Sequence, residues 1–505
     1  MDELDRRMLL EVTEESFTAG ELVTFVGDLI DLGMDEQDSA FLEKAMSVAE
    51  KVDQDQLSKQ EEIIFNYNIS NGWSNLLYLR YGGQISDWII DRLELSKSLY
   101  HLRKCIMIDG FSEVSSELRC NIYTNLGNHF SHVGRFVEAL ESWRKVFDID
   151  PDFPMALGNI GMGMYRYASH MHLESHRSIF VHQGYQFLQA GYRRKTDLHP
   201  AAAADFGTLL TSIESHWPKA FLNRKISLDF PLGKQRNVRA YKEWGIAESL
   251  YLNPLNDLGA VSIASHDCLH LPSMIVLPGS KPKYHSLYNQ LKQEYGTARF
   301  LYFEATQRPA RSHADKDLVL VDTLDYSDYS FNLEKVKIAY RLIYSIFDKI
   351  AYLINDYLEV GIPLNQISFR ALWHLDRNGE QLRPPFRGSS NLPLKALYWL
   401  SKDLFDRQGD HEVIEPEAQE LADIRNHIEH RSFKIKQYGS WGEVEDNFTF
   451  VIGRDEFEIK ALKQLKLVRA ALIYLSMAIH HEEKAKETKH VIPQYLPDMR
   501  QDYRI

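Results

Sequence analysis

The second half of the chain contains one long segment with the period of an amphipathic helix. From Glu334 to about Glu359, apolar side chains recur at every third or fourth position, which places them on one face of an α-helix. Gly361 and Pro363 follow and end the segment. An apolar face of this length must be buried, so it predicts other elements that pack against it. The face consists of Ala339, Leu342, Ile343, Ile346, Phe347, Ile350, Leu353, Ile354 and Tyr357.

Three more helical segments follow, at about 393–408, 415–431 and 457–487. Long helices joined by modest connections form an antiparallel bundle. Residues 436–455, between the last two helices, are interpreted as a small hairpin.

The first half of the chain is helical and repeats itself. Asn-Leu-Gly-Asn at 125–128 is matched by Asn-Ile-Gly-Met at 159–162, an offset of 34 residues, with Trp143 and Asp150-Pro151 between them. This pattern is similar to the tetratricopeptide repeat, in which small residues let two helices approach and Pro closes the unit. Such repeats stack and commonly bind a peptide or partner protein on their concave surface. A plain scaffold is the alternative.

We therefore expect a mainly all-α protein, with a helical-repeat solenoid followed by an antiparallel bundle. The centre is less regular, and residues 273–278 and 317–321 read as short extended pieces. The 505 residues suffice for several domains. The expected regions are an acidic N-terminal helical segment (1–37), a tetratricopeptide-like region (38–195), an irregular middle region packed on the bundle (196–330) and the bundle itself (331–505).

The net charge of −13 seems unsuited to a nucleic-acid-binding protein, but it is unevenly distributed. Residues 1–60 carry −11 of it, so the rest of the chain is nearly neutral. Basic residues recur every three positions near the C-terminus, which suggests a local surface for RNA, although such stripes are usually solvated helix faces. The candidate RNA-binding residues are Lys434, Lys436, Lys460, Lys463, Lys466 and Arg469.

Composition favours a cytoplasmic protein. Cys105, Cys120 and Cys268 are isolated and form neither a disulfide framework nor a zinc pattern. No apolar run approaches the length of a transmembrane helix. The acidic N-terminus does not resemble a secretory signal.

The hexapeptide Arg425-Asn426-His427-Ile428-Glu429-His430 combines an arginine, an amide and a histidine in a helical segment. Arginine offers a fixed fork for a phosphate, and histidine suits proton transfer near neutral pH. Four Arg-x4-His pairs occur in the chain, but only Arg425 is followed by Asn. Asn426 and His430 share a helix face, so the amide is expected to orient the imidazole. The competing interpretation is an Arg425–Glu429 ion pair on a solvated face.

The hexapeptide, on the third helix of a bundle, resembles the HEPN superfamily (higher eukaryotes and prokaryotes nucleotide-binding). Residues 251–258, 322–326 and 347–351 also look like a bacterial branch with a C-terminal HEPN domain. The resemblance implies a metal-independent endoribonuclease, often a toxin or an antiviral effector. It implies no cofactor.

The resemblance also implies roles for individual residues. His430 would act as general base or acid, Arg425 would stabilise charge on the phosphate, and Asn426 would hold His430 or the phosphate. One motif supplies one catalytic histidine, so a homodimer that pairs two motifs across the bundle is expected. Asp348 resembles an acidic residue near the motif, and His427 and Arg431 are further supporting candidates.

Two alternatives remain open. The bundle could bind RNA or a nucleotide without cleaving it, with the repeats assembling a complex. A metal-dependent nuclease could use His266-x-Cys268-x-His270, although loop or core roles suit these three residues better.

Overall fold

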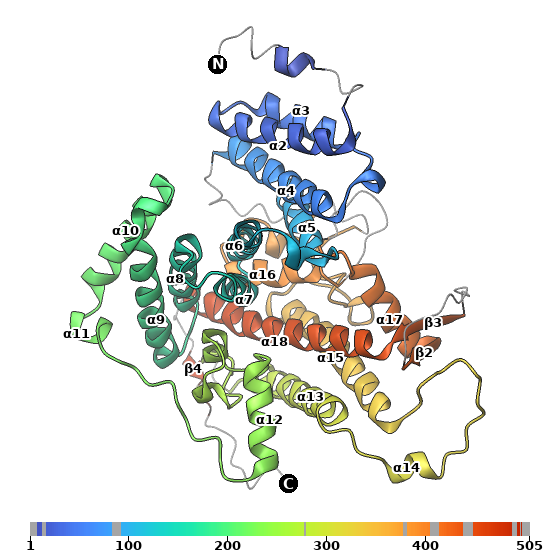
Figure 1. The fold of residues 1–505 in the computed structure, drawn as a ribbon. Coiled ribbons are helices and arrows are strands. Elements are labelled where there is room, and N and C mark those ends of the chain that lie inside the picture. The colour runs from blue at the N-terminus through green and yellow to red at the C-terminus, as the bar shows by residue number, and fades with distance from the viewer. Residues whose placement is uncertain are drawn as a thin grey trace.

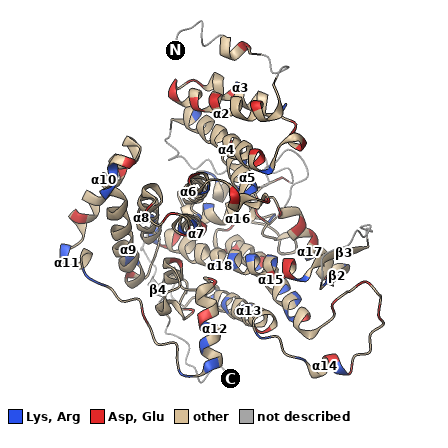
Figure 2. Ribbon diagram, viewed as in Figure 1, with Lys and Arg blue, Asp and Glu red and all other residues tan. Residues whose placement is uncertain are grey.

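The protein is described here from a computed structural model, which is mostly helical with a few short strands (Figure 1), as predicted. Within the part of the chain that the structure describes, no helix is both long and apolar enough to cross a membrane. The first helix with defined bounds, α2, carries acidic but no basic residues, so part of the predicted N-terminal acidity lies on it (Figure 2). The described residues are 8–12, 17–82, 92–276, 279–376, 381–404, 414–437, 448–486, 492–494 and 496.

The N-terminal half consists of helix pairs packed in series, and each pair contacts the next along the chain. Helical pairs were predicted there, while their identity as tetratricopeptide repeats stays a prediction. Tyr81 ends α4 and Gly82 caps it in the left-handed conformation, while residues 83–91 lie outside the described part of the chain. The pairs are α2 (Ala19–Asp35) with α3 (Ser39–Ala49), α4 (Lys59–Tyr81) with α5 (Leu93–Met107), α6 (Ser116–His132) with α7 (Phe136–Phe147), and α8 (Pro154–Ser169) with α9 (Glu174–Arg193).

Small residues allow these helices to approach closely. A Cβ atom added to Gly161 would lie 2.5 Å from the backbone N of Leu188, so α8 and α9 touch through their backbones. A Cβ on Gly127 would lie 2.4 Å from the Trp143 indole nitrogen. The matched glycines of the sequence repeat are therefore required by packing.

The middle of the chain contains one long helix that the sequence did not predict. This helix, α13 (Lys283–Thr306), packs along α15 (Phe331–Tyr357), the helix of the long apolar face. The expected extended piece at 273–278 contains β1 (Met274–Val276), which pairs antiparallel with β4 (Ile492–Gln494). The remaining helices of this region are α10 (Pro200–His216), α11 (Lys219–Leu222), α12 (Arg236–Ala247) and α14 (His313–Lys316).

The C-terminal bundle is built around α18 (Arg454–Ala485), which packs against α13, α15 and α16 (Leu392–Ser401). The motif helix, α17 (Ala418–His430), packs on α15. The apolar face of α15 is buried, as its period predicted.

The predicted hairpin is wrong in its topology. β2 (Ser432–Lys436) and β3 (Thr449–Gly453) do pair, but they run parallel, with Ser432 opposite Thr449. Parallel strands need a long connection rather than a tight turn. Most of that connection, 438–447, lies outside the described residues.

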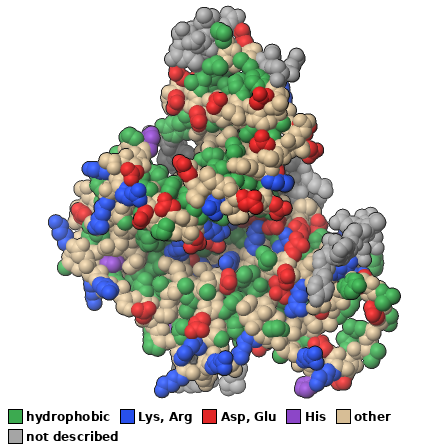
Figure 3. Space-filling view, in the orientation of Figure 1, with side chains coloured by type: hydrophobic (Ala, Val, Ile, Leu, Met, Phe, Trp, Pro, Cys, Tyr) green, Lys and Arg blue, Asp and Glu red, His purple; other side chains and the backbone are tan. Residues whose placement is uncertain are grey.

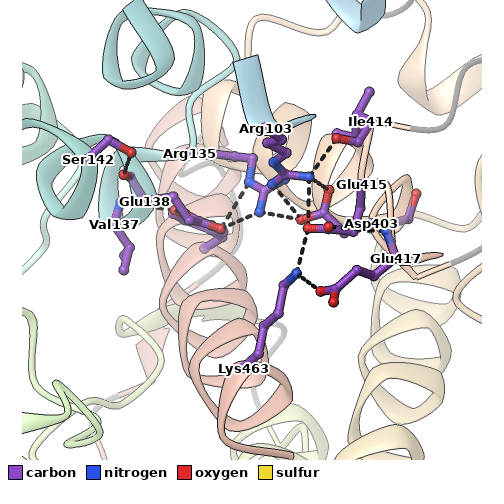
Figure 4. A network of polar contacts seen from close by, with 12 residues as sticks. Arg103, Arg135, Val137, Glu138, Ser142, Asp403, Ile414, Glu415, Glu417 and Lys463 are labelled. Carbon is purple, nitrogen blue, oxygen red and sulfur yellow. Dashed lines mark hydrogen bonds and ion pairs between the residues drawn. The ribbon is translucent and has the colours of Figure 1, made fainter. Parts of the chain in front are cut away.

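A buried ionic cluster joins the N-terminal helices to the bundle (Figure 4). Arg103 of α5 donates from Nη1 and Nη2 to the two carboxylate oxygens of Asp403, at 2.7 and 3.0 Å. Arg135, which precedes α7, donates to the same carboxylate at 2.7 Å and also to Glu138. Asp403 follows α16, so the N-terminal half fixes the chain close to the start of the motif helix. We call Arg103, Arg135, Glu138 and Asp403 the Asp403 cluster.

Candidate active site

The last two turns of α17 present the motif to solvent. Arg425 is about half-buried, while Asn426 and His430 are exposed. His430 is the last residue of the helix, and β2 begins directly after Arg431. The motif therefore lies at the end of the bundle that carries the strand pair.

Arg425 faces α15 across the bundle. Its Nη2 lies 3.7 Å from Oδ2 of Asp348, and its guanidinium carbon lies 5.4 Å from the centre of the Tyr344 ring. Oδ1 of Asp348 accepts a hydrogen bond from the backbone N–H of Phe369 at 3.0 Å. Asp348 is thus anchored and in turn orients Arg425.

The alternative Arg425–Glu429 ion pair is absent from the described contacts. Glu429 instead lies near Arg341, with its Oε1 3.6 Å from the arginine Nε. Among the described residues, the carboxylate nearest to Arg425 is that of Asp348 at 3.7 Å, beyond hydrogen-bond distance, so an approaching anion has a weak contact to displace.

Two cavities flank Arg425, and its side chain lines both together with Tyr344 and Asp348. The larger, of about 430 Å³, contains His430, and we call it the His430 cavity. The smaller, of about 230 Å³, contains Asn426, and we call it the Arg370 cavity. The His430 cavity is also lined by Arg341, Ser345, Lys349, Tyr352, Leu364, Ile367 and Glu429, and the Arg370 cavity by Ser368, Arg370, Leu404 and Ala422.

Arg425 and His430 therefore share one cavity, but Asn426 and His430 do not. Among the described contacts no hydrogen bond joins Asn426 to His430, and Asn426 lines the Arg370 cavity instead. Orientation of the imidazole by the amide therefore stays a prediction. The position of Asn426 leaves it available to a phosphate.

Residues 277–482 match the family model described as LA2681-like HEPN. This segment is an LA2681-like HEPN domain. It contains α13, α15, α16, α17 and both cavities. No curated protein and no solved structure matches the chain. A HEPN domain makes ribonuclease the first activity to test.

Helix α15 of the HEPN domain supplies two site residues that sequence reasoning missed, Arg341 and Tyr344. Arg341 of α15 donates from Nη2 to the carbonyl of Ile428 at 2.6 Å, which holds the last turn of α17. The Tyr344 hydroxyl donates to the carbonyl of Leu421 at 3.2 Å, and burial raises the pKa of Tyr344 to about 12. The available signal was their spacing from Asp348, because residues seven and four positions before it lie on the same helix face.

His427 stabilises the HEPN domain from inside and does not line either cavity. Its ring is buried, donates from Nδ1 to the carbonyl of Asp423 at 2.8 Å and lies 5.4 Å from the Phe450 ring. The supporting role of His427 at the site stays a prediction, and its contacts are with the motif helix and β3 rather than with either cavity. Arg431 is exposed outside both linings, and its backbone N–H donates to the carbonyl of His427 at 3.1 Å.

The predicted basic stripe is not an open surface. Lys460 and Arg469 are buried, so an RNA-binding role is wrong for these two. Lys460 Nζ donates to Glu417 and Glu420 at 2.7 Å, and Arg469 pairs with Asp257 at 2.6 Å. The prediction failed because their partners come from distant parts of the chain.

The other four basic candidates also have partners or are covered. Lys463 pairs with Glu415 and Glu417, Lys466 lies 3.3 Å from Glu248, Lys434 pairs with Asp325, and Lys436 is buried.

One carboxylate that pairs with these basic residues, Glu417, lies at the start of the motif helix. Burial raises the pKa of Glu417, but Lys463 and Lys460 outweigh it and lower that pKa to about 2. Glu417 is the N-cap residue of α17, so this ionic group fixes the first turn of the motif helix to α18.

Among the described residues, no group of three or more His, Cys, Asp or Glu side chains is arranged to hold a metal ion. The side chains of the His266-x-Cys268-x-His270 motif have other neighbours. The His266 ring lies against Phe230, and Cys268 Sγ lies 3.8 Å from His176 Nε2. His270 donates from Nδ1 to the carbonyl of Leu271 at 2.7 Å.

Proposed function

We propose that the protein is a metal-independent endoribonuclease with its active site at the His430 cavity. One observation carries the proposal: Arg425 and His430 line the same open cavity in a segment that matches a HEPN domain. Both residue types suit phosphate chemistry, because guanidinium binds phosphate oxygens and imidazole transfers protons near neutral pH.

The reaction is an internal transesterification of RNA. The 2′-oxygen attacks the adjacent phosphorus while the bond from phosphorus to the 5′-oxygen breaks. A base removes the 2′-hydroxyl proton, and an acid protonates the departing 5′-oxygen. His430 fills one of these roles, and Arg425 stabilises the charge that develops on the phosphate oxygens. The products are a 2′,3′-cyclic phosphate and a 5′-hydroxyl.

A second copy of the chain supplies the second histidine in this proposal. Support comes from an exposed apolar segment, Leu318–Val321, in which Val319 is 95% exposed. The chain after α14 forms a long extended loop (Figure 1), and hydrophobic side chains lie on the surface of this part of the molecule (Figure 3). Monomeric proteins rarely expose several adjacent apolar side chains. The segment is tied to the strand that follows the motif, because the Asp328 N–H donates to the Ile435 carbonyl at 2.8 Å. In this proposal the partner covers the segment and also faces His430.

The helical N-terminal half regulates the site in this proposal, and the Asp403 cluster is the physical link. The resemblance to toxins and antiviral effectors further suggests that expression of the active enzyme slows bacterial growth. Growth arrest by wild type, relieved in His430→Ala, would support that role.

Cleavage of RNA in EDTA tests the enzyme directly. Wild type should yield cyclic-phosphate ends, and Arg425→Ala or His430→Ala should lower the rate by at least about a hundredfold. The matched control is Arg308→Ala with His313→Ala, a pair of the same spacing outside the cavities. Intact RNA with dimeric wild type, tested with and without cell extract as a source of activator, would contradict the proposal. RNA bound but never cut would favour the binding-protein alternative.

A further inference from the structure

The two cavities beside Arg425 differ in chemistry. Away from His430, the wall of the His430 cavity is aromatic and apolar, with Tyr352 45% exposed and Leu364 72% exposed. An exposed tyrosine and leucine in an otherwise charged cleft offer a surface on which a flat aromatic ring can stack.

The Arg370 cavity, in contrast, is suited to an anion. Arg370 is exposed and has no carboxylate partner among the described residues. The Ser368 and Asn426 side chains line the same cavity and can donate hydrogen bonds. Arg370 beside two neutral donors suits a phosphate group. The Asp348 carboxylate on the same lining already contacts Arg425 and accepts from the Phe369 N–H.

The distances along α15 match one step of a nucleic-acid strand. Tyr352 follows Asp348 by one helical turn, which is an axial rise of about 6 Å. Asp348 contacts Arg425, so a base attached to a nucleotide whose phosphate lies at Arg425 can reach Tyr352. The Arg370 cavity adjoins the His430 cavity through their shared lining residues Tyr344, Asp348 and Arg425, so the neighbouring phosphate of the same strand would lie there.

We propose that the cavities are two adjoining subsites for one RNA strand. Tyr352 stacks the base of the nucleotide on the His430 side, and Arg370 binds the phosphate on the Asn426 side. The substrate class is single-stranded RNA, because a base must leave its helix to stack on a side chain. This inference rests on the proposed function for the position of the scissile phosphate at Arg425.

Binding of a short 2′-O-methyl RNA strand, which cannot undergo the cleavage reaction, tests each subsite by fluorescence anisotropy over a range of salt. Tyr352→Ala should weaken binding roughly tenfold, and Tyr352→Phe should restore it, because the ring alone stacks. Arg370→Gln should lower the slope of log affinity against log salt by about 0.7, the value for one phosphate on a single strand. Tyr352→Ala should leave that slope unchanged.

Two exposed residues far from the cavities provide matched controls, Tyr78→Ala and Arg236→Gln, and both should bind as wild type does. An abasic scan of the strand adds a second measurement. Removal of the base at one position of the strand should weaken its binding to wild type about as much as Tyr352→Ala weakens binding of the intact strand. The same abasic strand should bind Tyr352→Ala no more weakly than the intact strand does. A duplex of the same sequence should compete poorly.

The outcomes separate the two proposals. Wild-type affinity and salt slope in both Tyr352→Ala and Arg370→Gln would overturn the subsites, even if the enzyme cleaves RNA. Failure of wild type to cleave natural RNA would overturn the proposed function, while the binding measurements would still decide the subsites.

Discussion

The Asp403 cluster should be the most sensitive point of the connection between the two halves of the protein. Asp403 and Arg135 are almost completely buried, and the carboxylate is shared by two guanidinium groups. Asp403→Asn removes the only negative charge that both arginines contact at hydrogen-bond distance. Arg135 would keep Glu138 at 2.7 Å, and Arg103 would keep the Ile414 carbonyl and Glu415 at 3.4 Å.

The magnitude follows from these remaining contacts. Removing one partner of a buried ion pair costs about 3–5 kcal/mol, because a buried charge is left uncompensated. Because these partners remain, Asp403→Asn should lower the free energy of unfolding by about 3 kcal/mol. Asp403→Ala also loses the acceptor oxygen and should lower it by about 5 kcal/mol. This loss of stability should make the two halves separate at a lower urea concentration than the one that unfolds each half.

Urea unfolding of the full chain, combined with hydrogen exchange, measures this loss. In Asp403→Asn the protection of α5, α7 and the first turn of α17 should fall, while that of α2 and α3 should be unchanged. Asp205→Asn, an exposed carboxylate on α10, is the control and should change stability by less than about 0.5 kcal/mol. A loss below about 1 kcal/mol in Asp403→Asn, with normal protection of α7, would refute the reasoning.

Three other predictions concern the site and its supports. Lys463 and Lys460 lower the pKa of Glu417 from its ordinary value of 4.5 to about 2. Ionised Glu417 therefore stabilises the folded protein fully above pH 4.5, and this stabilisation is lost as the pH falls from 4.5 toward 2. Glu417→Gln should make the free energy of unfolding less dependent on pH in that window. Arg341→Gln frees the Ile428 carbonyl and should lower kcat roughly tenfold with little change in RNA affinity, whereas equal losses in both would indicate a binding role. Val319→Asp with Val321→Asp should convert dimer to monomer in light-scattering measurements without lowering the melting temperature, and an unchanged mass would exclude this segment from the interface.

The fold was predictable where one face of a helix is buried along its whole length. The long apolar face gave α15 because every third or fourth residue is apolar. α13 was missed although its pattern was available, because Tyr288, Leu291, Tyr295, Ala298 and Tyr302 recur at every third or fourth position along one buried face. The parallel pairing of β2 and β3 was not predictable, since a parallel pair is decided by the path of its connection and not by local turn residues.

The site was predictable only within one helix. The sequence combined Arg425 and His430 in one helical motif and placed Asn426, not Arg425, on the face of His430, whereas the cavity that contains His430 is lined by Arg425. The opposite wall comes from α15, about eighty residues earlier, and no local pattern specifies which residues of α15 face the motif. The stripe from Lys460 to Arg469 shows the same limit. Its three-residue spacing fits a solvated face as well as a buried one, and only distant carboxylates such as Asp257 and Glu417 decide between them.

The motif helix is held at both of its ends, and this arrangement can couple the N-terminal half to the site. At its start, Glu417 is fixed to α18 by Lys460 and Lys463, and Lys463 also reaches Glu415, which contacts Arg103 of the Asp403 cluster.

At its end, Arg341 holds the Ile428 carbonyl two residues before His430. A helix of this length moves as a rigid rod, so a change at its first turn alters the position of His430 relative to Arg341 and the His430 cavity. A ligand on the N-terminal helices can shift activity only by as much as its affinity differs between the two positions of α17. Because Arg103 and Arg135 join the N-terminal helices to Asp403, Asp403→Asn should weaken the proposed regulation while leaving Arg425 and His430 chemically intact.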